Sequence, residues 1–345
     1  MNELASVIAL SYPVETAIKM GVILGVIPVG AMLLGYVFLF KMMAHMQSRV
    51  GPMEAGPHGS LQVIMEGVKF LQKEDLMPRG ADGPVFKMAP MIAIMATFLI
   101  YAVIPVGPDL VIADLDVGIF YALAVGSISV LGVLMAGWAS ANKYSLLGAL
   151  RAAGQLIAYE LPLVLAVVGV VIQAGTMSLS GIVMAQAEGE IFGFGGLGNP
   201  FILTQFVGFV IFLVAAQAEL TQAPFDMPVA ESELVSGYMT EYSGFRFLLF
   251  FGIAEPATAF GLSAIAASLF LGGWYLPGVG TDTLANVVGP LVLLAKIMIV
   301  AFFIFWFRFT YPRFREDQLQ TFAWKYLIPI SLVNIAATAV LKVVF

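Results

Sequence analysis

Residues 287–309, VVGPLVLLAKIMIVAFFIFWFRF, decide the fold class of this chain. A helix needs about 20 mainly apolar residues to cross the hydrocarbon core of a bilayer, and this stretch is long enough. Seven further apolar stretches occur, near 16–40, 86–106, 117–138, 155–175, 200–220, 246–272 and 322–343. We therefore predict an all-α, polytopic helical membrane protein with about eight transmembrane helices, forming a single membrane domain over residues 1–345.

The composition excludes several classes of protein. Hydrophobic residues make up 60% of the chain and charged residues 11%, whereas a soluble domain averages about 25% charged residues. The chain has no cysteine, which excludes disulfides and cysteine-ligated iron–sulfur clusters. Its two histidines, His45 and His58, fall in one polar loop, so a bis-histidine haem inside the bilayer is excluded. We expect no metal, no iron–sulfur cluster and no redox centre in this chain.

The charged residues between the apolar stretches predict the orientation of the chain. The first, third, fifth and seventh loops carry the basic residues Lys41, Arg49, Lys69, Lys73, Arg79, Lys87, Lys143, Arg151, Arg246, Arg308, Arg313, Arg315 and Lys325. The other loops carry no Lys or Arg, and their acids are Asp109, Asp114, Asp116, Glu188, Glu190 and Asp282. Because cytoplasmic loops are enriched in Lys and Arg, we expect the odd loops in the cytoplasm and both termini outside.

The first loop, residues 44–84, contains one helical pattern. In residues 59–75, GSLQVIMEGVKFLQKED, one helical face holds Leu61, Ile64, Met65, Val68 and Leu71. The opposite face is polar, which is typical of an amphipathic helix lying in the membrane interface. A plain surface connector is the alternative interpretation.

Residues 218–247, AELTQAPFDMPVAESELVSGYMTEYSGFRF, concentrate acids beside two apolar spans. Acids near lipid are costly and usually serve a site or an ion path, so this loop predicts a site for protons, cations or a polar headgroup. Pro224 and Pro228 prevent a regular helix here. A solvated acidic loop is the simpler interpretation, but apolar side chains interleave with the acids. The acids are Glu219, Asp226, Glu231, Glu233 and Glu241, and Arg246 is the only base.

Three ionisable residues fall inside other predicted spans. Glu160 is followed by Pro162, and Glu255 is followed by Pro256. Each acid is either part of a proton path or an acid that reaches the interface or pairs with a neighbouring helix. Lys296 either reaches the outer surface or is the counter-charge of a buried acid. Arg308 and the basic residues after it are sufficiently explained as a cytoplasmic anchor.

Four segments resemble one known family. They are MQSRVGPMEAGPHGSLQ (46–62), GWASANKYSLLGALRAAGQLIAYELP (137–162), AELTQAPFDMPVAESELVSGYMTEYSG (218–244) and FRFTYPRFREDQLQTFAWKYLIP (307–329). In this order they resemble the quinone-site membrane subunits of respiratory complex I, the family of the H subunit, or chain 1, of NADH-quinone oxidoreductase. The sequence departs from the family pattern at Leu39, Phe40, Gln222 and Val229, where the family usually or often has charged residues.

The resemblance implies a function within a larger enzyme. Such a subunit walls the tunnel and chamber for a quinone, ubiquinone or menaquinone, and couples quinone reduction to proton translocation. It contacts the other membrane-arm and peripheral-arm subunits and lipid, and it binds no nucleic acid. We expect a multi-pass protein of the bacterial inner membrane. The predicted quinone-site residues are Arg49, Phe225, Asp226, Glu231, Glu233 and Arg246, and the predicted proton-path residues are Glu160, Glu219, Glu241, Glu255 and Lys296.

Two other functions remain open at this point. One is the homologous subunit of a membrane-bound hydrogenase-type complex, and the other is a stand-alone proton- or cation-coupled transporter. A transporter works when it is purified alone, whereas a subunit co-purifies with partners and is inactive without them.

Overall fold

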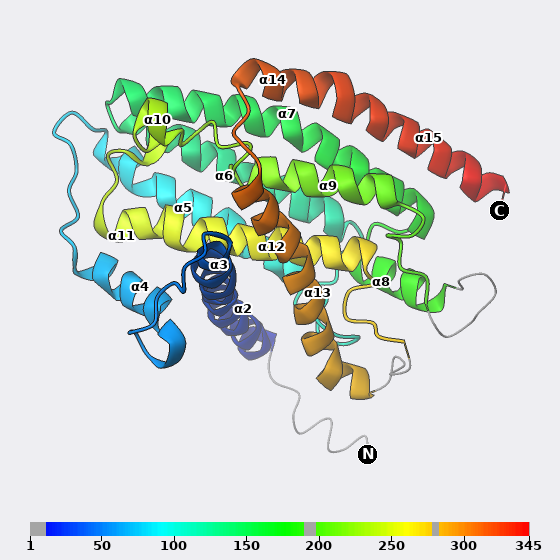
Figure 1. Cartoon of the computed structure of the whole chain (residues 1–345). Coiled ribbons are helices and arrows are strands. Elements are labelled where there is room, and N and C mark those ends of the chain that lie inside the picture. The colour runs from blue at the N-terminus through cyan, green and yellow to red at the C-terminus, as the bar shows by residue number, and fades with distance from the viewer. Residues whose placement is uncertain (1–11, 190–197, 278–282, 345) are drawn as a thin grey trace.

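The computed structural model describes residues 12–189, 198–277 and 283–344, and in these ranges it contains helices and no β-strand (Figure 1). Within them seven helical spans are long and apolar enough to cross a membrane. The prediction of an all-α, polytopic helical membrane protein is thereby confirmed. Glu190 and Asp282, which were placed in the fourth and sixth loops, lie outside the described residues. The seven spans are Met20–Met46, Gly83–Val103, Gly118–Ala139, Lys143–Ala174, Gly244–Phe270, Ala285–Thr310 and Glu316–Val343.

Several of these spans are built from more than one helical segment. The first joins α2 (Tyr12–Leu34) to α3 (Met43–Met46) through a π-helical turn, Gly35–Met42. The sixth helix of the sequence joins α11 (Gly244–Phe247) to α12 (Glu255–Phe270) through a second π-helical turn, Leu248–Ala254. The other helices are α4 (Gln62–Gln72), α5 (Gly83–Ile100), α6 (Gly118–Ala139), α7 (Lys143–Ala174), α8 (Leu179–Glu188), α9 (Phe206–Glu219), α10 (Glu231–Leu234), α13 (Thr283–Thr310), α14 (Glu316–Phe322) and α15 (Ile328–Val344).

The predicted helix at 200–220 is shorter than expected. It forms as α9, which has 14 residues and is about 21 Å long, less than the ~30 Å of a hydrocarbon core. The chain before it turns at 201–204, where Leu203 N donates to Pro200 O and Gln205 N donates to Phe201 O. The residues before α9 are apolar, as the sequence indicated, but Pro200 places them in a turn and not in the helix.

Helix α7 is longer than expected, because it begins at Lys143 and not near residue 155. Asn142 caps it by accepting a hydrogen bond from Tyr144 N over 2.8 Å. The residues between are mostly Ala, Leu and other good helix formers, so the helix extends beyond the apolar stretch. Lys143 and Arg151 are therefore helical, which corrects their placement in a loop.

The predicted amphipathic helix of the first loop is present as α4. It has 11 residues, none of them buried, and its apolar face is exposed. Short helix α8, by contrast, was not predicted, because its ten residues lie in a region of mixed polarity.

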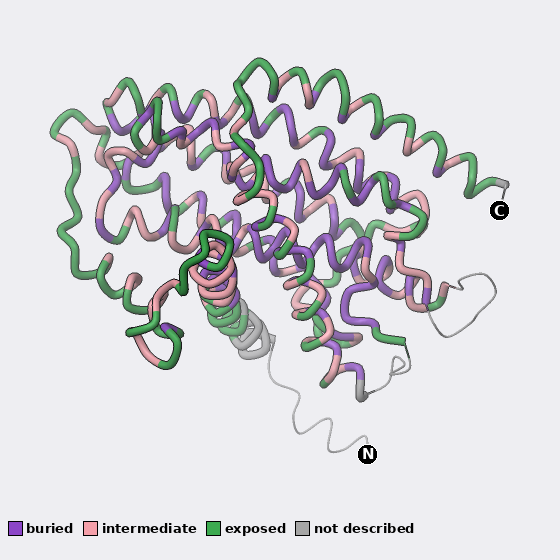
Figure 2. The backbone as a smooth tube through the Cα atoms, in the orientation of Figure 1, coloured by how far each residue is buried: buried purple, intermediate pink, exposed green. Residues whose placement is uncertain are grey.

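The centre of the bundle is α12. Every residue from Pro256 to Phe270 except Thr258 is buried, and α12 packs against α2, α9 and α13. Figure 2 shows buried residues along α12 and α9 and exposed ones along α4 and α15. Exposed side chains on the outer helices include Val287, Leu291, Val333 and Val340, as expected for surfaces that face lipid. Glu255 begins α12 directly after a π-helical turn, a feature common at functional sites.

Candidate functional site: a carboxylate-lined cavity

The acidic loop between α9 and α11 is fixed by contacts from buried glutamines. Gln155 on α7 donates from Nε2 to Ala218 O and to Phe225 O, each over 2.7 Å. Gln217 donates to Ala223 O over 2.7 Å. These contacts use the backbone carbonyls of a segment that its prolines keep out of a helix. The first part of the loop is therefore held against α7 and is not a solvated segment, whereas Glu231 and Glu233 further on are exposed.

Two glycines allow this loop to lie directly on α7. A Cβ atom added to Gly148 would lie 2.8 Å from Pro228 O and from the Cα of Gly237. Gly237 has φ +54°, and a Cβ there would overlap Pro228 O at 1.8 Å. Larger residues at either position would push the loop away from α7.

A cavity of about 240 Å³ opens beside this loop, among α5, α6, α9, α12 and α13. Its apolar lining includes Leu156, Val229 and Phe250, and its hydroxyl groups come from Thr97, Ser129, Thr221, Thr258 and Tyr238. Acids are costly among apolar helices, so their convergence here marks this cavity as the candidate site. The acids that line it are Glu219, Asp226, Glu231 and Glu255.

Glu255 has an arginine and an amide as its partners. Arg308 Nη1 lies 3.0 Å from Glu255 Oε1, and Gln222 Nε2 donates to the same oxygen over 2.9 Å. Arg308 thus turns inward from the end of α13, and explaining it only as a cytoplasmic anchor was wrong. Lys296 is not the counter-charge of this acid, because its ammonium group donates to Tyr275 O over 2.7 Å and lines neither cavity described here.

Burial sets the protonation of Asp226. It raises the pKa of this carboxyl to about 6, against the opposing effect of the Arg308 and Arg313 charges. The negative charge of Glu255 adds to the increase. Burial also raises the pKa of Tyr238.

A second, smaller cavity of about 20 Å³ leads deeper into the bundle. Glu160 from α7 lines it, and so does Glu219, which lines the larger cavity as well. Thr97, Ser129 and Thr258 are also shared by the two cavities. Glu219 and these hydroxyl groups therefore stand between Asp226 and Glu160.

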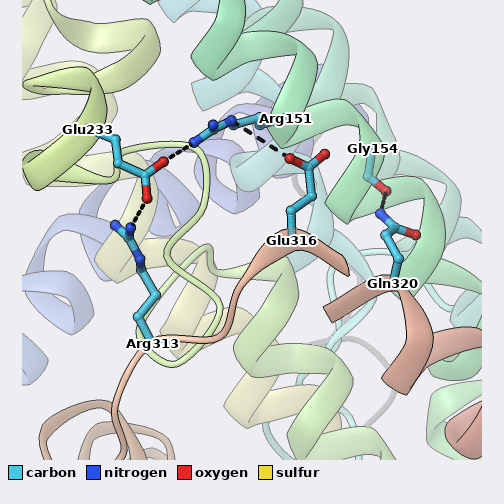
Figure 3. A network of polar contacts seen from close by, with 6 residues as sticks. All are labelled: Arg151, Gly154, Glu233, Arg313, Glu316 and Gln320. Carbon is cyan, nitrogen blue, oxygen red and sulfur yellow. Dashed lines mark hydrogen bonds and ion pairs between the residues drawn. The ribbon is translucent and has the colours of Figure 1, made fainter. Parts of the chain in front are cut away.

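Glu233 lies outside both cavities, in a cluster that we call the Glu233 cluster (Arg151, Glu233, Arg313 and Glu316). Arg151 Nη1 lies 2.6 Å from Glu233 Oε2, and Arg313 pairs with the other carboxylate oxygen (Figure 3). Arg151 also lies 3.8 Å from Glu316, at the start of α14. The hydrogen bond from Arg151 contributes most to lowering the pKa of Glu233. Nearby, Gln320 Nε2 donates to Gly154 O over 3.0 Å, a second contact between α14 and α7.

The remaining predicted site residues have separate partners. Arg246 lies 2.9 Å from Asp75 and 5.4 Å from the ring centroid of Phe86, and so ties the first loop to α11. Glu241 accepts a hydrogen bond from Asn142 over 2.5 Å.

The last two predicted residues, Phe225 and Arg49, also lie away from the two cavities. Phe225 is buried, with ring centroids 5.1 Å from Tyr159 and 5.5 Å from Phe314. Arg49 is exposed after α3 and donates to Gln47 over 2.8 Å. In the described ranges no group of three or more His, Asp or Glu side chains is placed to hold a metal ion.

The fold and the cavity define a polytopic helical membrane protein with a site lined by carboxyl groups. The sequence profile of the NADH dehydrogenase family matches residues 18–339, so the chain belongs to that family. Its relatives include proteins named as the H subunit of NADH-quinone oxidoreductase, from Bacillus mycoides and Brevibacillus brevis. The first is 47% identical over 306 residues, covering 88% of this chain and 87% of the relative. The second is 46% identical over 315 residues, or 90% of each. The resemblance found in the sequence is thereby confirmed.

Proposed function

We propose that this chain is the membrane subunit of a proton-pumping NADH:quinone oxidoreductase that forms the quinone entry tunnel and chamber and couples quinone reduction to proton translocation. The observation that carries the proposal is the convergence of Glu219, Asp226, Glu231 and Glu255 on one cavity inside an apolar bundle. Membership of the NADH dehydrogenase family supports it.

The chemistry of quinone reduction defines a role for each of several cavity side chains. Reduction of one quinone to quinol takes two electrons and two protons. In this proposal the electrons come from NADH through partner subunits, and the protons pass through carboxyl groups of this chain. Asp226 and Glu231 face the larger cavity beside Arg308, whose charge stabilises a reduced, anionic quinone oxygen. Phe225 holds the neighbouring Asp226 in place through its packing against Tyr159.

The proposed proton route continues from the larger cavity through Glu219 to Glu160, with Glu255 at its entrance. Glu241 and Lys296 line neither cavity, and their predicted place on a proton path stays a prediction. The same holds for Arg49 and Arg246 at the quinone site. The quinone is ubiquinone or menaquinone.

The proposed setting is the inner membrane of a bacterium, where the subunit contacts lipid and the other membrane-arm and peripheral-arm subunits. The basic residues predict the acidic loop in the cytoplasm and both termini outside. Accessibility labelling of cysteines introduced at Phe70 and Glu188 tests this orientation. The two positions should react from opposite sides, and labelling of both from one side would rule the topology out.

Amide variants of the cavity acids test the function. Asp226→Asn and Glu231→Gln are introduced into the complete complex, and NADH oxidation is measured with a quinone and with an artificial soluble acceptor. We expect the quinone-linked rate to fall by at least about ten-fold, since proton transfer by a positioned group contributes roughly 10²–10⁴-fold. The rate with the soluble acceptor should not change.

The matched control is Glu188→Gln, an exposed acid at the end of α8. It should leave both rates unchanged. Normal quinone kinetics in both cavity variants would show that the cavity does not serve quinone reduction.

A further inference from the structure

The two cavities meet at a pair of threonine hydroxyls. Thr97 Oγ1 on α5 and Thr258 Oγ1 on α12 lie 3.0 Å apart, and both residues line both cavities. Thr97 is buried, and its hydroxyl reaches Ala93 O over 3.3 Å. Thr258 is the one residue of Pro256–Phe270 that is not buried, because it borders this space. Either hydroxyl can donate to the other, and the pair keeps lone pairs for a further donor.

The volume of the smaller cavity matches a single water molecule. It measures about 20 Å³, and a water needs roughly 10–15 Å³ on this scale together with two to four polar partners. The polar groups in its lining are Glu160, Glu219, Thr97, Ser129 and Thr258. Ser127 also lines it, but its hydroxyl donates to Ala124 O over 2.8 Å. Its apolar walls, such as Leu123 and Ile265, leave no room for a larger polar ligand.

We propose that the smaller cavity is a binding site for one water molecule that bridges Glu219 and Glu160, held in place by the hydroxyls of Thr97, Thr258 and Ser129. The inference rests on the proposed function and adds to it the group that completes the proton route.

Proton transfer through this water neither gains nor loses a proton overall. The carboxyl of Glu219 gives a proton to the water, and the water gives one of its own to the carboxylate of Glu160. Glu219 ends as a carboxylate, Glu160 ends as a carboxylic acid, and the water is regenerated. Thr97 and Thr258 are positioning residues in this step, because they hold the water and pass on no proton themselves.

The test distinguishes the effect of the two hydroxyl groups from the effect of side-chain shape. Thr97→Val with Thr258→Val keeps the shape and removes both hydroxyls, whereas Thr97→Ser with Thr258→Ser keeps the hydroxyls. Proton-to-electron ratio, quinone-linked turnover and the solvent deuterium isotope effect are measured for the complete complex in vesicles. We expect the valine pair to lower turnover by about five-fold, the effect of losing one hydrogen bond, and to raise the isotope effect. The serine pair should recover most of the loss.

Ser263→Ala is the matched control. Ser263 is a buried residue of the same helix, α12, and its hydroxyl bonds back to Ala259 O over 2.7 Å and lines neither cavity. It should leave all three readouts unchanged.

Glu160→Gln and Glu219→Gln, measured alongside, separate this inference from the proposed function. Impaired proton movement in the acid variants with normal turnover in the valine pair would overturn the water site and leave the proposed function standing. Normal behaviour of all these variants would overturn the proton route through the two acids as well. Equal losses in the valine and serine pairs would show that packing, and not the hydroxyls, matters here.

Discussion

Arg151 Nη1 donates to Glu233 Oε2 over 2.6 Å and so joins α7 to α10, which lies in the acidic loop. The same carboxylate pairs with Arg313, in the segment that leads to α14. Phe314 N donates to Pro224 O over 2.9 Å in that segment as well. The Glu233 cluster therefore holds the acidic loop against two elements far away in the sequence, and Glu233 positions the loop although it lines neither cavity (Figure 3).

The first prediction concerns this cluster. Glu233→Gln removes both ion pairs, and we expect local opening of residues 229–236, measured by hydrogen–deuterium exchange, to become about five-fold faster. The magnitude follows from the ~0.2–1 kcal/mol of an exposed ion pair, of which two are lost. KM for quinone should rise more than kcat falls, because the loop and not the chemistry is affected.

Glu316→Gln is the control for this experiment, since it loses only the 3.8 Å contact with Arg151. Its exchange rates should stay close to those of the unaltered chain. Unchanged exchange in Glu233→Gln would show that the cluster does not restrain the loop.

The second prediction concerns the pair of Glu255 and Arg308. The two side chains are each 23% exposed, so breaking the pair leaves a largely desolvated charge. We expect Arg308→Met to destabilise the subunit by about 2 kcal/mol, below the 3–5 kcal/mol of fully buried pairs. Glu255→Gln alone is expected to cost less, because Gln222 still finds an oxygen acceptor there.

The double variant with both substitutions removes both charges. It should be more stable than Arg308→Met alone, as a double-mutant cycle in thermal unfolding measures. Additive losses in the cycle would mean that the pair contributes no coupling.

The third prediction concerns pH. The pKa of Asp226 lies at about 6 in the folded protein, so this carboxyl is protonated below pH 6 and ionised above it. The unfolded chain has the lower pKa, near 3.8, so the folded state binds the proton more tightly between about pH 4 and 6. The contribution of Asp226 to stability is therefore present at low pH and is lost as the pH rises through 6.

An infrared titration of the carboxylic acid C=O band measures this directly. Asp226→Asn should remove a component that titrates near pH 6, and Asp226→Glu should keep a titrating carboxyl. A band that is identical in the unaltered protein and in Asp226→Asn would contradict the assignment.

The sequence predicted the helices better than the contacts. Long apolar stretches determine a transmembrane helix almost alone, because the backbone has no other way to satisfy its hydrogen bonds in lipid. Hydropathy gives no boundary where a helix leaves the membrane, as in α7, or where a proline shortens it, as in α9. Acids were found because they are rare in and beside apolar spans, and four of them line one cavity.

The partners of the acids were not predictable in the same way. Arg308 lies at the end of an apolar stretch, where a basic residue is normally an anchor, and only the fold turns it towards Glu255. Thr97 and Thr258 gave no signal at all, since isolated hydroxyls in transmembrane helices usually bond to their own backbone. Lys296 gave a strong signal, yet its partner is the backbone oxygen of Tyr275. A charge in a span marks a polar contact, and the sequence does not say which one.

The last prediction concerns the close contact between α7 and the acidic loop. In Gly148→Ala the new Cβ would lie 2.8 Å from Pro228 O, Gly237 Cα and Tyr238 N, all of them backbone atoms that no side-chain rotation can move. We expect the loop to shift and the quinone-linked rate to fall at least five-fold, with a destabilisation of about 1–3 kcal/mol from overpacking. Gly154→Ala on the same helix is the control, since its Cβ would meet only Gln320 Nε2, at 3.9 Å. Alanine favours a helix interior, so this variant should be as active as the unaltered protein and slightly more stable. Equal activity in the two variants would mean that the quinone-linked rate does not depend on close contact between the loop and α7.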